Sequence, residues 1–175
     1  MTSRLWKVLC WNVRGVNADK KWNSIRDKVL SSNCDIVCLQ ETKRETIDLS
    51  FIRNICPQAF DSFVFRPSLG ASGGIVVIWK SAVFSGTEIF QNEFAISTEF
   101  TSRINDESWV LRTVYAPCTS NGKRDFLEWF KNIQMPDHID WLIFGDFNLI
   151  RKPEDKNKEG VISLKCTILM RPSVC

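Results

Sequence analysis

The sequence has little excess charge of either sign, no long hydrophobic run and no recognisable leader segment. Its formal net charge is +3 over 175 residues, which is compatible with nucleic acid as a partner but too small to argue for one. No apolar stretch approaches the roughly 18 residues of a membrane span, and the first residues lead straight into a strand-like run. We therefore expect an intracellular protein, in the nucleus or the cytoplasm, with no membrane partner.

The seven cysteines form no C-x-x-C pair, so the usual spacing of a zinc site is absent. Cys10, Cys34 and Cys38 lie in or beside apolar runs, where a free cysteine behaves as a small hydrophobic residue. We expect buried thiols rather than a disulfide framework. The glycines of segment 70–74 lack the pattern of a phosphate-binding loop and favour a hairpin turn instead.

Hydrophobic residues make up 44% of the chain and charged residues 25%, a composition typical of a globular domain. Two apolar β-prone runs flank an amphipathic segment near the N-terminus, which predicts two strands of one sheet with a helix between them. Further along, short β-prone runs separated by turns favour antiparallel hairpins. The expected strands are 6–13, 35–40, 63–66, 75–79, 88–91, 95–100, 109–115 and 141–144, with helices at 20–30 and near 126–133.

Together these elements predict an α+β fold, a two-sheet sandwich with helices packed outside. We place the domain at residues 1–150. Residues 151–160 form a charged segment, and 161–175 show neither helical nor strand periodicity. We therefore expect a charged loop and an irregular tail over 151–175, with one more short strand as an alternative for the tail.

Polar residues of catalytic type stand at the ends of four expected strands. Asn12 ends the first strand and Glu41 follows the second. Tyr115 ends the strand at 109–115, and Asp146 and Asn148 follow the strand at 141–144. Because strand ends feed loops on a rim of a sheet, a rigid scaffold can position reactive groups there. These residues are the candidate site.

The chemistry of these side chains fits metal-assisted phosphate hydrolysis. Two carboxylates with amide oxygens suit a hard cation such as Mg²⁺, and a tyrosine can donate a hydrogen bond to a phosphate oxygen. Spacing alone leaves other interpretations open. Each residue taken singly also fits a turn or cap, and Gly145–Asn148 alone fits a tight turn whose side chains bond their own backbone.

Five short motifs occur in one order along residues 5–150. They are Trp11–Gly15, Leu39–Lys43, Ser72–Ile75, Val114–Pro117 and Gly145–Asn148. In this order they resemble the successive motifs of the endonuclease/exonuclease/phosphatase family. The resemblance is to the apurinic-type endonuclease domain of plant LINE-type (non-LTR) retrotransposons in particular. It implies a four-layer α/β/β/α sandwich and hydrolysis of phosphodiesters, with DNA as the partner.

The resemblance also implies a role for each matched residue. Glu41 resembles the family's Mg²⁺ ligand, with Mn²⁺ as an alternative ion, and Asn12 the asparagine that helps to hold the metal. Tyr115 resembles the tyrosine at the scissile phosphate. Asp146 resembles the aspartate that orients the attacking water. Asn148 resembles a phosphate-binding asparagine.

Lys43 stands beside these residues as a further candidate for substrate binding. It follows directly on Gln40–Thr42, and a lysine there favours the retrotransposon branch of the family. Lys43 and Arg44 together suit either a nucleotide or a phosphoinositide as the substrate. The alternatives are thus a phosphatase or exonuclease relative of the same fold, or a non-catalytic fragment that binds nucleic acid.

The family pattern ends in a Ser-Asp-His motif that this sequence lacks. Its single histidine, His138, precedes Gly145–Asn148 and is therefore in the wrong order. We interpret His138 as a solvated turn residue. The missing motif leads us to expect a C-terminally truncated domain with an incomplete second sheet, a degenerate fragment with little activity.

Overall fold

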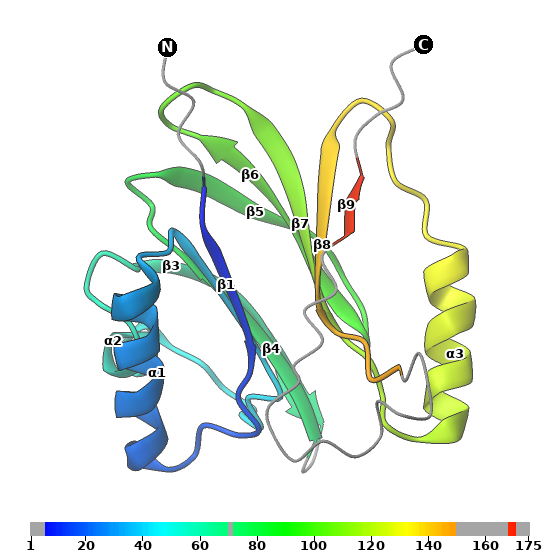
Figure 1. The fold of residues 1–175 in the computed structure, drawn as a ribbon, viewed down its shortest axis with the longest axis horizontal. Helices are drawn as coiled ribbons and strands as arrows, with labels where there is room; N and C mark the ends of the chain where they lie inside the picture. The colour runs from blue at the N-terminus through cyan, green and yellow to red at the C-terminus, as the bar shows by residue number, and fades with distance from the viewer. Residues whose placement is uncertain (1–5, 70–71, 150–167, 171–175) are drawn as a thin grey trace.

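The computed structural model describes residues 6–69, 72–149 and 168–170. Two β-sheets lie face to face, with helices on the outer side of each (Figure 1). Helices α1 and α2 cover the first sheet and α3 covers the second. The α+β fold and the four layers that the sequence predicts are therefore confirmed.

The first sheet has four strands in the order β1-β2-β4-β3. The parallel pairing of β1 with β2 confirms the expected strand–helix–strand opening. Strand β4, rather than β3, lies next to β2, so the chain crosses over before it returns. The elements are β1 (Val8–Asn12), α1 (Asp19–Ser32), β2 (Ile36–Gln40), α2 (Leu49–Ile55), β3 (Ser62–Leu69) and β4 (Ser72–Trp79).

The second sheet has the order β5-β6-β7-β8-β9. Its first three strands form the expected antiparallel hairpins. Strands β7 and β8 are parallel, with α3 as the connection between them. The elements are β5 (Phe84–Gln91), β6 (Ala95–Ser102), β7 (Ser108–Tyr115), α3 (Ser120–Lys131), β8 (Asp140–Asp146) and β9 (Ile168–Met170).

Hydrophobic side chains fill the three spaces between the layers. Strand β2 is buried along its whole length, which explains why its sequence is apolar without alternation. Between the two sheets an aromatic cluster includes Trp79, Phe84 and Phe100, whose rings contact one another at centroid distances of 5.3 and 5.5 Å. This packing fixes the two sheets against each other and so fixes the positions of the strand ends.

Helix α2 is an element that the sequence analysis missed. It has only seven residues and is N-capped by Asp48, whose side chain accepts a hydrogen bond from the backbone N–H of Phe51 at 2.7 Å. Its apolar residues Phe51, Ile52 and Ile55 are buried against the first sheet. Helix α3 also differs from the expectation, because it starts at Ser120 and ends at Lys131, before Ile133.

Several smaller expectations are confirmed. Cys10, Cys34 and Cys38 are buried thiols, and His138 lies exposed in a turn. Leu69 pairs with Ser72, so β3 and β4 are neighbouring antiparallel strands, and residues 70–71 of the expected turn lie outside the described residues. Apart from β9, the loop and tail expected over 151–175 lie outside the described residues.

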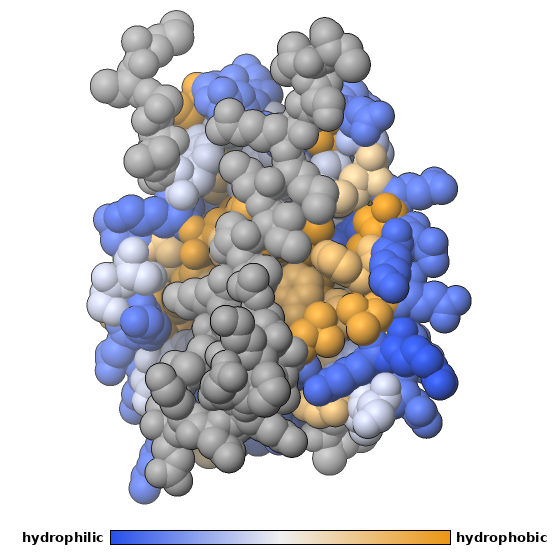
Figure 2. Space-filling model, turned by 45° about the vertical axis from the view of Figure 1, so that its right-hand side comes forward, coloured by the Kyte–Doolittle hydropathy of each residue, from blue (hydrophilic) through white to orange (hydrophobic). Residues whose placement is uncertain are grey.

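The exterior is largely hydrophilic at its edges. The face in Figure 2 carries hydrophilic residues at its sides and hydrophobic residues toward its middle. In the described part of the chain, no helix is both long and apolar enough to cross a membrane.

Candidate active site

The candidate residues lie on one rim of the sandwich. Strands β1 and β2 are parallel and so are β7 and β8, so each pair brings its two C-terminal ends together. In Figure 1 β1 and β8 both end toward the lower side of the view. The rim therefore collects side chains from both sheets.

A hydrogen bond joins the two sheets at this rim. The Asn12 side-chain amide donates to Oδ2 of Asp146 at 2.7 Å, and Asn12 Oδ1 accepts from the backbone N–H of Arg14 at 3.0 Å. On the other side Asp146 Oδ1 accepts from the backbone N–H of Asn148 at 3.0 Å. The Asn148 amide donates to the carbonyl of Ala116 at 2.5 Å. Both carboxylate oxygens of Asp146 are thus held in place.

Glu41 is held by its backbone. Its φ is +56°, a left-handed conformation that is uncommon and unfavourable for a residue with a side chain. Three hydrogen bonds fix it there, because the Glu41 carbonyl accepts from Gly15 N–H at 2.6 Å and the next two residues donate to Gly74 and Gly73. Such strain is a mark of functional positions when the surrounding structure imposes it.

Tyr115 lies close to the carboxylates of Glu41 and Asp146. It is half-buried, and burial raises its pKa above the ordinary 10.0. The negative charges of Glu41 and Asp146 and a hydrogen bond to Glu41 raise the pKa further. The phenol is therefore protonated at neutral pH and can act as a hydrogen-bond donor.

Lys43 forms an ion pair with Glu41 at the rim. Its Nζ lies 3.3 Å from Oε1 of Glu41, and both side chains are partly exposed. The ion pair shows that the Glu41 carboxylate faces a space where a cation is stable. Because both side chains are partly exposed, the ion pair contributes only roughly 0–1 kcal/mol to stability.

The crowded backbone around residue 145 explains why a glycine precedes Asp146. Its φ is +150°, and a Cβ at this position would lie 1.9 Å from the Val114 carbonyl oxygen. No side chain fits there, because the obstacle is backbone of the neighbouring strand. The glycine thus lets β8 approach β7 closely where Asp146 leaves the sheet.

The family model described as "Endonuclease/Exonuclease/phosphatase family" matches residues 9–157. The chain belongs to this family. No curated protein matches the chain significantly.

Solved structures of the endonuclease/exonuclease/phosphatase fold are similar to it. The human Nocturnin catalytic domain with bound sulfate anion has a TM-score of 0.62 at 15% identity, covering 82% of this chain and 64% of that one. A Bacteroides thetaiotaomicron mannosyl-6-phosphatase has a TM-score of 0.59 at 13% identity, covering 81% and 64%. An AP endonuclease from Leishmania major has a TM-score of 0.57 at 18% identity, covering 93% and 61%.

These likenesses show the fold. The chain spans less than two thirds of the length of each of the three structures. Members of the endonuclease/exonuclease/phosphatase family are hydrolases, both nucleases and phosphatases. Its nucleases generally use divalent metal ions.

The rim has a donor set that fits such an ion. Within the described residues, no three His, Cys, Asp or Glu side chains form a ready metal site. The rim instead offers the carboxylates of Glu41 and Asp146 with the amides of Asn12 and Asn148. Mg²⁺ takes one or two carboxylates and keeps several waters. Lys43 already places one positive charge beside Glu41.

Sequence analysis missed a group of polar residues beside this rim. Arg66 is 7% exposed, Ser68 is 4% exposed and Thr42 is fully buried. Burial lowers the pKa of Arg66, and the charges of Glu93 and Tyr115 partly offset this. The alternation of β3 was the available signal, since Phe63 and Phe65 pack on the helix side and leave Arg66 and Ser68 facing the other sheet.

Two other features lie away from the rim residues. His138 precedes β8, whereas Asp146 ends it, which separates them by about 20 Å at strand rise.

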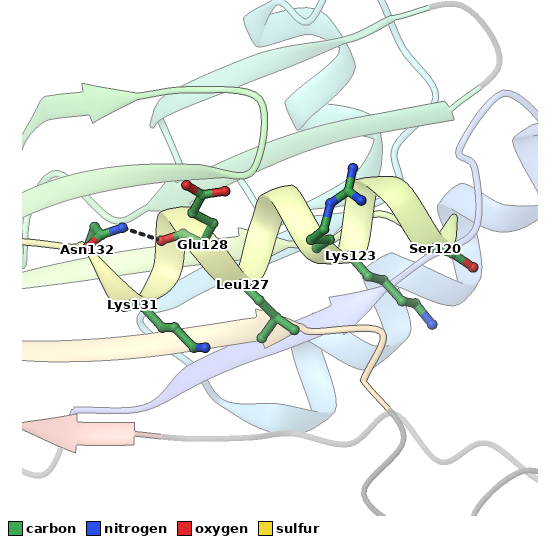
Figure 3. Close-up of a pocket in the computed structure, with 7 residues that line it drawn as sticks. Ser120, Lys123, Leu127, Glu128, Lys131 and Asn132 are labelled. Carbon is green, nitrogen blue, oxygen red and sulfur yellow. Dashed lines mark hydrogen bonds between the residues drawn. The ribbon is translucent and has the colours of Figure 1, made fainter.

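A hollow of about 490 Å³ runs along α3 (Figure 3). In that view Lys123, Leu127 and Lys131 point to one side of the helix. The hollow has no pair of carboxylates and is not the candidate active site.

Proposed function

We propose that this rim hydrolyses phosphodiester bonds of DNA with Mg²⁺, as a nicking endonuclease of LINE-retrotransposon type. The convergence of Asn12, Glu41, Tyr115 and Asp146 from four strands of two sheets carries the proposal. These residues are far apart in the sequence, and tight turns formed separately would not bring them together.

Each residue has a role that its contacts allow. Asp146 holds the attacking water and orients it, because Asn12 and the backbone of Asn148 fix both its oxygens. Tyr115 keeps its proton and donates a hydrogen bond to an oxygen of the scissile phosphate. The second amide hydrogen of Asn148 is left to bind the same phosphate group, since the first is directed to Ala116.

Glu41 would hold Mg²⁺ together with Asn12, and Mn²⁺ is the alternative ion. When bound, the ion supplies a Lewis acid at a phosphoryl oxygen and charge for the leaving oxygen. With Glu41 on the ion, Lys43 would be available to bind a substrate phosphate. The proposal thus assigns Glu41 to the metal ion and Lys43 to the substrate, and it needs no residue beyond those already at the rim.

DNA is the favoured substrate class. An AP endonuclease is among the similar structures, and the motif order is that of LINE endonuclease domains. The likeness to the mannosyl-6-phosphatase favours a phosphatase as the second candidate. A non-catalytic nucleic-acid-binding role is the third, and it requires neither the metal nor Glu41.

The 175-residue chain should be a weak nuclease. Its single histidine lies at the opposite end of β8 from Asp146, so no imidazole reaches the scissile phosphate from within the chain. Loss of one general acid–base group typically costs about 10²–10⁴-fold in rate. We therefore propose trace nicking at most.

Plasmid nicking tests the proposal. Supercoiled DNA is incubated with the chain in Mg²⁺ or in EDTA, alongside Glu41→Gln and the control Asp140→Asn, a carboxylate at the other end of β8. We expect slow nicking that needs Mg²⁺, is lost in Glu41→Gln and persists in Asp140→Asn. Nicking that survives EDTA or Glu41→Gln would contradict the assignment. Rapid nicking would contradict the weak-nuclease claim, and DNA binding without any nicking would support the third candidate.

A further inference from the structure

Arg66 is a buried cation beside the proposed active site. It lies on β3 opposite Ile75 of β4, on the face turned toward the second sheet, and is 7% exposed. Its Nη2 lies 3.3 Å from where a Cβ of residue 73 would be. The absence of a side chain at Gly73 thus leaves room for the guanidinium near the rim.

The polar groups around Arg66 lack partners. Of six buried side-chain N or O atoms without a hydrogen bond in the described residues, three lie here: Arg66 Nε, Ser68 Oγ and Thr42 Oγ1. They are connected locally, because Ser68 pairs with Gly73 and the Thr42 N–H donates to the Gly74 carbonyl. Buried polar groups are nearly always paired, so unpaired ones concentrated at one place call for a ligand.

The charge at this place selects the kind of ligand. Arg66 Nε has no hydrogen-bond partner among the described residues, and none of the ion pairs found among them includes its guanidinium. The facing groups Glu93 and Tyr115 act on it only through space. An unpaired guanidinium with two hydroxyl groups forms a set of donors. Such a set matches an anion with several oxygens, and the planar fork of arginine matches a phosphate.

A hollow at the surface reaches Ser68, one member of this group. It has a volume of about 300 Å³, and Ser68 lines it together with Lys43 and Arg44. Arg44 is oriented there, because its Nε donates to the Thr46 carbonyl and its guanidinium lies 4.2 Å from the centroid of the Phe51 ring. The other lining residues are Asn17, Glu45 and Thr46. The lining carries two cations and one carboxylate, and Lys43 is in addition paired with Glu41 until a substrate phosphate takes its place.

We propose that Arg66 and Ser68, with Lys43 and Arg44 lining the hollow, form a second phosphate subsite that binds a backbone phosphate next to the scissile one. The proposal rests on the proposed function, because the second phosphate belongs to the same nucleic-acid substrate. It assigns Arg66 to substrate binding and gives it no part in the chemical step. The subsite also explains why β3 keeps an arginine where an apolar residue would pack.

Direct observation of the Arg66 side chain tests the subsite without any activity. Arginine Nε–H signals of the full 175-residue chain are followed by NMR during titration with inorganic phosphate and with a thymidine dinucleotide. Loss of one signal in Arg66→Lys assigns Arg66. We expect a saturable shift of this signal with the dinucleotide, while the signal of Arg103, whose Nε donates to the Ser81 carbonyl beyond the far end of β4, stays unchanged. A shift with inorganic phosphate alone, or no shift with either probe, would overturn the proposal.

Neutral phosphates locate the contact on the substrate. A short duplex carries one methylphosphonate at successive positions, and its affinity is measured in Ca²⁺ for the unaltered chain and for Arg66→Leu. We expect one flanking position at which neutralisation weakens binding of the unaltered chain about tenfold and hardly affects Arg66→Leu. Equal losses for both proteins at every position would refute the subsite.

Two controls separate the failure of the subsite from the failure of the proposed function. Arg103→Leu removes the same charge from an exposed site and should keep the position-dependent loss. Glu41→Gln should abolish nicking and still show that loss. If Glu41→Gln nicks normally while Arg66→Leu loses its phosphate contact, the proposed function is wrong and the subsite stands. Thermal unfolding shows whether Arg66→Lys and Arg66→Leu fold. If Arg66→Leu does not fold, Arg66→Lys, which lacks the planar fork of arginine, is used for both measurements.

Discussion

Asn12 and Asp146 are 134 residues apart in the sequence, and a 2.7 Å hydrogen bond joins their side chains. Asn12 ends the first strand of one sheet, and Asp146 ends β8 of the other. The bond therefore closes the sandwich at the rim where Glu41 and Tyr115 also lie. An asparagine suits this position, because its amide donates to the carboxylate while its oxygen accepts from the backbone of Arg14.

Replacement of Asn12 should weaken the contact between the two sheets and so lower the stability of the fold. Asn12→Ala removes a partly buried hydrogen bond to a charged group, which typically contributes about 1.5–3 kcal/mol. We expect the free energy of unfolding in urea to fall by roughly that amount. Asn54→Ala, an exposed position on α2, is the control and should change it little. Equal stability of Asn12→Ala and the unaltered chain would show that the bond does not hold the sheets together.

Tyr115 is the only tyrosine of the chain, so tyrosinate absorbance reports on it alone. Its pKa is raised in the folded state, mainly by burial. We expect the folded protein to show no tyrosinate signal at pH 10.0, where the tyrosine of the urea-unfolded chain is half ionised. Because the folded state then binds more protons than the unfolded one, stability should fall as the pH rises above 10. Half ionisation at pH 10.0 in a folded sample would place the phenol in solvent.

Lys43 should affect metal and nucleic acid in opposite directions. Lys43→Met removes the cation that competes for Glu41, so we expect Mn²⁺ affinity to rise about twofold to fivefold, the range of a partly exposed ion pair. DNA affinity should fall, because a phosphate contact is lost. Lys80→Met, which breaks the Lys80–Asp35 pair, is the matched control and should change neither affinity. A fall in both affinities would mean that Lys43 stabilises the rim rather than competing for it.

Much of the fold could be predicted because its strands are apolar runs bounded by turns. Strand β2 is buried on both faces and β7 ends at Tyr115, as the sequence indicates. Helix α2 was missed because seven residues give less than two helical turns of periodicity. Its N-cap Asp48 and the spacing of its apolar residues were the signals available.

The sequence nominated the candidate site residues, and the structure adds the contacts between them. Ordered motifs identified Asn12, Glu41, Tyr115 and Asp146, but motif order carries no distances. The left-handed backbone of Glu41 follows from hydrogen bonds to two separate segments, which no local pattern encodes. Arg66 escaped notice because a single arginine in a short strand is normally a solvated edge residue, and the alternation with Phe63 and Phe65 that places it on the inner face was not used.

Binding of Mn²⁺ alone, measured by calorimetry on the full 175-residue chain, tests most directly that this rim is a metal-dependent hydrolase site. Three proteins are compared: the unaltered chain, Glu41→Gln, and Asp140→Asn at the far end of β8. We expect one site on the unaltered chain, the same affinity in Asp140→Asn and an affinity at least about tenfold weaker in Glu41→Gln. Unchanged Mn²⁺ affinity in Glu41→Gln would contradict the assignment of the site.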